Sequence, residues 1–310
     1  MLDSRAVRAI AALALVVCAA GCGGSGRASH GRVAAPPGSA APPTTAPPAV
    51  HRPALRAALV RSASTTRSAR TALTSISVTV TGLGENAYAN GGFDVAGTGA
   101  VDLASGDADL LLSIPLFDRL DTGGAIEERI VDGIAYARLP APVMRLGGLP
   151  PTVRWLRIDA VRSGTAPATT LSRSRVDPAG EIEFLGAVSD DIRPVGVEAV
   201  RGTPTTHYEA TIAGGTDPRS ELGRRLGAVG ARLGPGRVDV DVWIDGAGLA
   251  RRIVVTVPLS AAGAGENTGG APAVRMQADF YGFGAAVRPA APPSAQVRPF
   301  AALRLPSLGA

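Results

Sequence analysis

Apolar and polar residues alternate along the middle of the chain, and this pattern predicts β-strands. It is clearest at residues 75–81, where Ile76, Val78 and Val80 point to one side and serine and threonine to the other. Similar patterns predict strands over residues 93–103, 108–114, 126–131, 134–139, 153–160, 192–200, 205–212, 238–244, 249–257 and 274–283.

Short turn sequences separate consecutive strands. Asp132-Gly133 is the strongest of these hairpin signals, and Arg201-Gly202 and Asp245-Gly246 occupy equivalent places between other strands. Successive hairpins predict a mostly antiparallel sheet of about ten strands.

Three segments have helical periodicity instead. The first covers residues 53–73, and the other two begin at Asp177-Pro178 and Asp217-Pro218, each an N-cap followed by a first-turn proline. The apolar stripes of the two later helices consist of Ile182, Leu185 and Val188, and of Leu222, Leu226 and Val229. Because such stripes must be buried, we expect an α+β fold: a curved, mostly antiparallel sheet with helices on its concave face.

The N-terminus has the features of a secretory signal. Arg5 and Arg8 precede a run of small and apolar residues at 9–20, which is too short to span a bilayer as a mature helix. The run ends in Ala19-Ala20-Gly21-Cys22, which is similar to the lipobox of bacterial lipoproteins although Ala19 stands where leucine is usual. That resemblance implies a diacylglycerol and fatty-acid (palmitate) anchor on Cys22. The alternative is an ordinary signal peptide cleaved near Ala20.

Composition divides the chain into four parts. Residues 1–21 are the expected signal, residues 22–53 a disordered tether rich in Pro, Ala and Gly, and residues 54–288 one folded domain. Residues 289–310 are again rich in Pro and Ala and are expected to be a loose tail. The predicted location is the extracytoplasmic face of the cell membrane.

Charge and cysteine usage exclude several classes of function. All 31 basic residues are arginines, the formal net charge is +5, and acids and bases are interspersed without a basic stripe. Nucleic-acid binding is therefore not expected, whereas weak attraction to anionic lipid headgroups is. Both cysteines lie in or beside the signal, so the folded domain has no disulfide and no thiol chemistry.

The titratable residues suggest no catalytic or metal site. His207 lies in a predicted strand, and the chain contains no G-x-S-x-G motif that would mark a serine nucleophile. This favours a structural histidine over a member of a catalytic triad. Three aspartates near one strand, Asp239, Asp241 and Asp245, resemble a solvated face more than a calcium loop. Neighbouring acids such as Glu127-Glu128 point to opposite faces of a strand. We therefore expect no enzyme activity, no metal and no cofactor.

The order of these segments resembles the LppX/LprAFG lipoproteins of actinobacteria, relatives of the LolA and LolB carriers. The resemblance covers residues 55–287 and rests on the segments 71–78, 126–136, 154–159, 202–208, 242–252 and 281–284.

The resemblance implies a half-open β-barrel with an apolar cavity, and a membrane-anchored lipoprotein that binds or carries lipid (acyl chains) there. The cavity lining expected here is Ile182, Leu185, Val188, Leu222, Leu226 and Val229. The aromatic residues either form the core or line the cavity, with core as the default. Two alternatives stay open: an envelope sensor of the RseB type that binds a protein partner instead of lipid, and a structural envelope protein without a ligand.

Overall fold

The computed structural model describes residues 52–81, 92–113, 125–158, 182, 185, 188, 191–212, 238–258 and 273–303. Its elements run in the order α2 (Arg52–Ser68), β1 (Thr71–Thr81), β2 (Gly92–Asp102), β3 (Ala108–Ser113), β4 (Ile126–Val131), β5 (Ile134–Arg138), α4 (Ala141–Leu146), β6 (Trp155–Ile158), β7 (Arg193–Val200), β8 (Thr203–Ile212), β9 (Val238–Asp245), β10 (Ala250–Pro258), β11 (Ala273–Tyr281), η3 (Ser294–Gln296), β12 (Val297–Pro299) and η4 (Phe300–Ala302).

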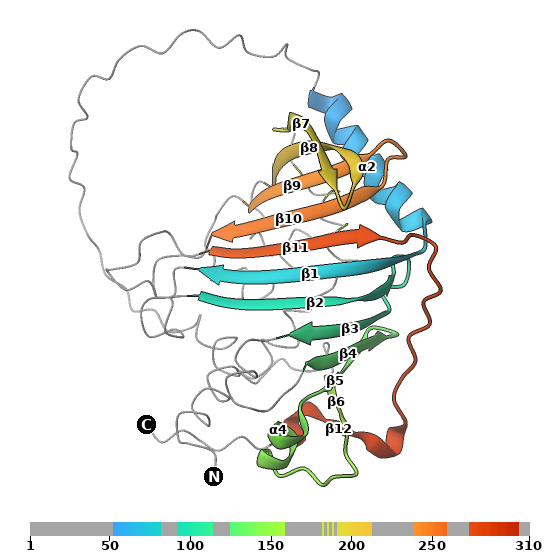
Figure 1. The fold of residues 1–310 in the computed structure, drawn as a ribbon, viewed down its shortest axis with the longest axis vertical. Coiled ribbons are helices and arrows are strands. Elements are labelled where there is room, and N and C mark those ends of the chain that lie inside the picture. The colour runs from blue at the N-terminus through green and yellow to red at the C-terminus, as the bar shows by residue number, and fades with distance from the viewer. Residues whose placement is uncertain are drawn as a thin grey trace, which may run out of the picture.

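The strands of the described residues join one open sheet in the order β12-β6-β5-β4-β3-β2-β1-β11-β10-β9-β8-β7 (Figure 1). Two antiparallel meanders, β1 to β6 and β7 to β11, meet where β1 pairs with β11. The β12–β6 pair is parallel and all other pairs are antiparallel. The predicted fold class, a curved and mostly antiparallel sheet with helical cover on one face, is confirmed.

The predicted hairpins are present. Asp132 and Gly133 both have positive φ angles, 51° and 73°, and join β4 to β5. Arg201 and Gly202, at 50° and 79°, join β7 to β8 in the same way. Positive φ at both central residues is the type I′ geometry, whose twist matches that of the flanking strands.

The opening helix ends earlier than the predicted residue 73. Helix α2 stops at Ser68, Arg70 takes a left-handed φ of 65°, and β1 begins at Thr71. Residues 71–73 carry helical spacing, but Thr71 pairs with Asp102 of β2 and Leu73 pairs with Tyr281 of β11. Pairing on both sides outweighs local helix propensity there.

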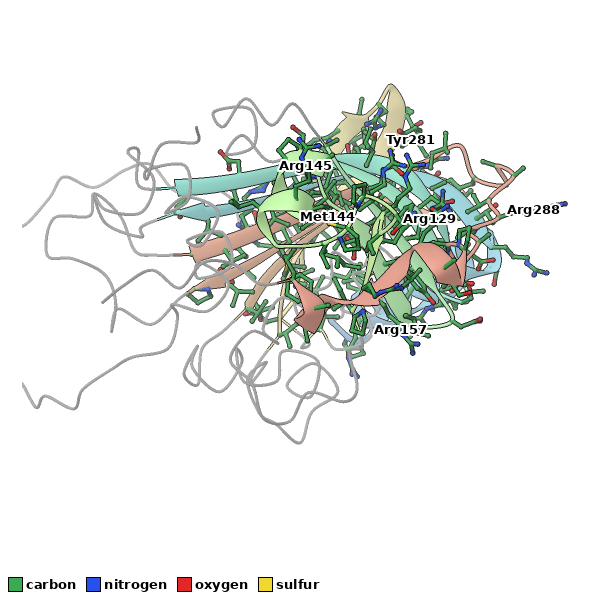
Figure 2. The ribbon with its side chains drawn as sticks, turned by 90° about the horizontal axis from the view of Figure 1, so that it is seen from below. Arg129, Met144, Arg145, Arg157, Tyr281 and Arg288 are labelled. Atoms are coloured by element: carbon green, nitrogen blue, oxygen red, sulfur yellow. The ribbon has the colours of Figure 1, made fainter. Side chains whose placement is uncertain are left out.

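The predicted loose tail from residue 289 is wrong for residues 294–302. These form η3, β12 and η4, and β12 adds to the sheet beside β6. Phe300 and Leu303 pack against a small separate core of Met144, Leu149, Val153 and Leu156. Apolar burial therefore orders this Pro- and Ala-rich segment, and Figure 2 shows Met144 at this end of the molecule.

The main core lies on one face of the sheet, here called the inner face. Along β1 this face carries the even-numbered residues, and Ala72 and Ile76 are buried in one cluster with Leu59 and Ala63 of α2. Within the described residues, no helix is long and apolar enough to span a bilayer.

Candidate functional site on the inner face of the sheet

The inner face is an almost continuous apolar surface from β3 to β8. Strand register aligns its side chains, because Ile76 of β1 lies opposite Ala278 of β11, and Ala278 lies opposite Ile253 of β10. All three are buried in the main core. The alternation read from the sequence therefore sorts apolar residues to this face and most charged residues to the other.

One end of the inner face is closed by α2. Leu59 of the helix is fully buried, and Phe280 of β11 is 1% exposed on the same face. The Thr66 hydroxyl accepts a hydrogen bond of 2.9 Å from the Ala250 amide, which fixes the helix to β10. The Thr66 hydroxyl also donates a hydrogen bond to the Ser62 carbonyl, so it acts both as a donor and as an acceptor.

The predicted cavity residues Ile182, Leu185 and Val188 lie in this closed end. They are 0%, 0% and 1% exposed and belong to the main core cluster. Arg56 of α2 donates a 3.1 Å hydrogen bond to the Val188 carbonyl. Their role as lining for a lipid remains a prediction. The other predicted lining residues, Leu222, Leu226 and Val229, lie outside the described residues, as does Cys22.

Towards the opposite ends of the central strands, the same face is only partly buried. Burial along β1 is complete at Ile76 and intermediate at Val78 and Val80. Five residues form this apolar surface, which we name the strip: Val78, Val80, Val95, Val274 and Met276. Register makes it continuous, because Val78 lies between Val95 and Met276, and Val80 lies opposite Val274.

Two glycines let β3 approach β2 closely beside the strip. A Cβ atom on Gly99 would lie 2.2 Å from the Asp109 carbonyl oxygen and 2.7 Å from a methyl of Leu110. A Cβ on Gly97 would lie 2.6 Å from a methyl of Leu112. The leucine side chains thus occupy the space above β2 that side chains of β2 would otherwise fill.

Thr74 is a polar exception in the closed end. Its side chain is fully buried on the inner face, and its hydroxyl has no hydrogen-bond partner. We expect Thr74→Val, which keeps the shape and removes this hydroxyl, to raise the free energy of unfolding by about 1 kcal/mol. Urea denaturation measures this, and a variant less stable than the parent would show that the hydroxyl is satisfied in solution.

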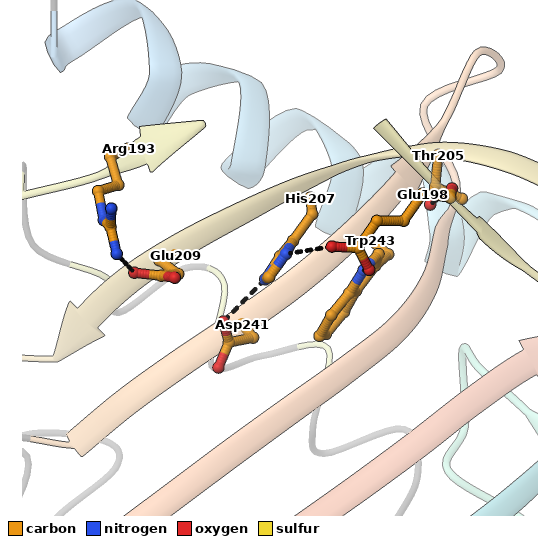
Figure 3. Close-up of polar contacts among 7 residues, drawn as sticks. All are labelled: Arg193, Glu198, Thr205, His207, Glu209, Asp241 and Trp243. Atoms are coloured by element: carbon orange, nitrogen blue, oxygen red, sulfur yellow. Dashed lines mark hydrogen bonds and ion pairs between the residues drawn. The ribbon is translucent and has the colours of Figure 1, made fainter. Parts of the chain in front are cut away.

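The outer face carries a polar cluster centred on His207 (Figure 3). The imidazole stacks on the Trp243 indole with ring centroids 4.0 Å apart. Its Nδ1 lies 3.1 Å from Glu198 and its Nε2 lies 2.8 Å from Asp241. Trp243 Nε1 donates to Glu198 at 2.8 Å. These contacts tie β7, β8 and β9 together, which agrees with the structural role predicted for His207.

The other carboxylates singled out in the sequence also have structural partners. Asp245 accepts from the amides of Ala247 and Leu249 in its turn and from Arg251 at 2.6 Å. Glu127 pairs with Arg138 on the outer face. Over the ranges that the structure describes, no three His, Asp or Glu side chains converge as metal ligands.

Hydrogen bonds from Trp243 and His207 lower the pKa of Glu198 below its ordinary value of 4.5. A carboxyl whose pKa is lower in the folded state stabilises the fold above its ordinary pKa. That contribution disappears as the pH falls through the lowered value. We therefore expect Glu198→Gln to reduce stability at pH 7 and this deficit to shrink below about pH 4.5. Urea denaturation across this range tests the expectation, which a deficit independent of pH would refute.

The architecture is thus that of an open, curved, mostly antiparallel sheet with helical cover on one face. No family model matches the chain, and no curated protein matches it either. Among solved structures, it is similar to the lipoprotein LppX of Mycobacterium tuberculosis, with 16% identity over 77% of this chain and 99% of that chain and a TM-score of 0.45. LprF of Mycobacterium bovis is 15% identical over 77% of this chain and 97% of that chain, with a TM-score of 0.38.

A third similar structure is MucB in the MucA/MucB complex of Pseudomonas aeruginosa. It is 16% identical over 82% of this chain and 63% of that chain, with a TM-score of 0.30. LppX and LprF both bear names of the group that the order of the sequence segments resembles.

Sequence reasoning missed the strip as a unit. It placed Val78 and Val80 on one face of a strand, but it did not show that Val95 and Met276 flank them. Met276 is almost two hundred residues further along the chain, and its pairing with Val78 depends on β1 meeting β11. No local turn or spacing signal carries that information.

Proposed function

We propose that this protein is an envelope lipoprotein that binds an acyl chain of a lipid against the strip. The observation that carries the proposal is the graded burial of the inner face: closed beneath α2 and partly exposed at Val78, Val80, Val95, Val274 and Met276. Covering such a surface with an acyl chain is favourable by about 0.8 kcal/mol per buried methylene. No catalytic group is needed for this function.

The proposal includes anchoring through Cys22. A lipid-modified cysteine followed by a tether would keep the domain at the membrane while leaving it free to reorient. We expect the parent chain to stay with membranes that are washed in high salt, which screens binding to headgroups, and Cys22→Ser to appear in the soluble fraction. Incorporation of a labelled palmitate analogue into the parent but not into Cys22→Ser is the accompanying readout. Equal labelling of the two chains would contradict the anchor.

The strip can be tested with two neighbouring substitutions on β1. Val78→Glu puts a carboxylate on the inner face, where an acyl chain would have to desolvate it, whereas Thr79→Glu puts the same group on the outer face. We expect Val78→Glu to weaken binding of a fluorescent fatty acid by about tenfold or more. Thr79→Glu should bind like the parent. Both positions are only partly buried, so both variants should fold.

Titration of the fluorescent fatty acid, with circular dichroism as a check on folding, measures the difference between the two variants. Equal affinities for Val78→Glu and the parent would place the ligand away from the strip.

A second candidate is an envelope interaction module of the RseB type that binds protein rather than lipid. The edge strand β7 favours it, because all its residues except Val200 are exposed and Val197 is 77% exposed. An exposed edge strand can accept a further strand from a partner. Pro194 and the irregular register between Pro194 and Gly196 restrict such pairing, which is why lipid binding is preferred.

A further inference from the structure

One end of the described structure is rich in arginine. It consists of residues 133–158 and 288–303, which form β5, α4, β6, η3, β12 and η4, and we call it the basic end. These two segments contain six arginines and no aspartate or glutamate. Residues 52–70, which include α2, are another stretch with arginines and no acidic residue. The basic end differs because it joins two such stretches that are far apart in the chain.

Packing fixes the two segments into one platform. Strand β12 pairs in parallel with β6, with Val297 opposite Trp155. The Arg154 amide donates a 2.9 Å hydrogen bond to the Gln296 carbonyl. A Cβ on Gly147 would lie 2.2 Å from a methyl of Leu303, so the end of α4 and the residue after η4 are in close contact. The arginines therefore project from a continuous support.

The arginine side chains face solvent. Arg145, Arg154, Arg157, Arg288 and Arg298 are all exposed. In Figure 2, Arg145 lies next to Met144 on α4, and Arg288 lies at the right-hand edge of the view. Arg145 belongs to the last turn of α4, and the Arg298 guanidinium donates to the carbonyl of its chain neighbour Val297.

Two acidic residues on the strands next to the basic end already form ion pairs with arginines. Asp109 of β3 lies 3.3 Å from Arg129 of β4, and Glu127 of β4 lies 2.6 Å from Arg138 of β5. Both of these guanidinium groups lie over the Trp155 ring, at 4.7 Å and 5.9 Å from its centroid. These two acids therefore do not offset the charges of Arg145, Arg154 and Arg298.

We propose that the basic end docks the folded domain on the anionic phospholipid headgroups of a bilayer. Guanidinium groups bind phosphate through paired hydrogen bonds, and clustered arginines are attracted to an anionic membrane surface within about a Debye length. A membrane is favoured over an acidic protein or a nucleic acid because the predicted export signal and tether would place the domain beside a bilayer. This contact is additional to the anchor on Cys22. It rests on the envelope location but not on acyl-chain binding at the strip.

Vesicle binding of the chain from residue 22 onward, carrying Cys22→Ser so that no acyl anchor contributes, tests the proposal. We expect it to sediment with vesicles of phosphatidylglycerol and phosphatidylcholine but not with phosphatidylcholine alone. Neutralising Arg145, Arg154 and Arg298 with glutamine should lower the partition coefficient about fivefold per arginine, or roughly a hundredfold in the triple variant. High salt should release the parent chain.

The matched control replaces Arg193, Arg201 and Arg275 with glutamine, none of which belongs to a stretch without acidic residues. These are also exposed, lie outside the basic end and change the net charge equally. The control should bind like the parent. Equal loss in both triple variants would overturn a localised docking surface, as would equal binding to both vesicle types or no binding at all. Because the strip is tested by fatty-acid titration in solution, failure here and failure of the proposed function are distinguishable.

Discussion

Replacing Phe280 with alanine is expected to lower the free energy of unfolding by about 3–5 kcal/mol. Phe280 is the largest of the fully buried side chains, at 1% exposed, and it lies on the inner face opposite Thr74. Its removal leaves a cavity in the closed end beneath α2, which neighbouring strands fixed by pairing on both sides can fill only partly.

Phe280→Leu is the control for this prediction. Leucine keeps most of the apolar volume and should cost less than about 1.5 kcal/mol. Guanidinium denaturation of the parent and both variants, fitted with one common dependence of the unfolding free energy on denaturant concentration, gives both losses of stability. A loss below about 1.5 kcal/mol for Phe280→Ala would mean that the closed end collapses around the gap and is not tightly packed.

Gly99→Ala is expected to destabilise the fold by about 3 kcal/mol, because the added methyl group has no space. Its Cβ would approach the Asp109 carbonyl oxygen to 2.2 Å, and this oxygen belongs to the backbone of β3. Side-chain rotation cannot relieve that contact, so β2 and β3 would have to separate. Loss of their close approach would also alter the inner face beside the strip.

Gly196→Ala is the matched control for the clash at Gly99. Gly196 also lies in a strand, and a Cβ added there meets nothing within 4 Å. The free energy of unfolding of Gly196→Ala should differ from that of the parent by less than about 0.5 kcal/mol. The denaturant midpoints of the two variants show whether the loss of stability comes from the steric clash or from strand propensity. Similar losses of stability at both positions would assign the effect to strand propensity alone.

Much of the sheet was predictable because its signals are local. The alternation at Ile76, Val78 and Val80 defined the buried face of β1, and Asp132-Gly133 defined a hairpin through backbone geometry that few other residues adopt. His207 was assigned a structural role from the lack of a nucleophile motif, and its contacts with Glu198 and Asp241 agree with that interpretation.

The errors arose where distant contacts decide the structure. Residues 71–73 read as the end of a helix until β2 and β11 pair with them. The segment around Val297 has little to bury by composition, but Phe300 and Leu303 complete a small core formed by α4 and β6. The lining predicted from two helical stripes stays a prediction. Ile182, Leu185 and Val188 of one stripe lie in the main core, and the strip, which lies on strands, was not predicted.

The central claim, that the inner face binds an acyl chain, is tested most directly by native mass spectrometry. The chain from residue 22 onward, with Cys22→Ser, would be purified without detergent, and its spectrum would be compared with lipid analysis of a solvent extract. Our account predicts a species carrying about one lipid per protein, displaced by added fatty acid and reduced in Val78→Glu but not in Thr79→Glu. A bare protein that also fails to take up added lipid would contradict it.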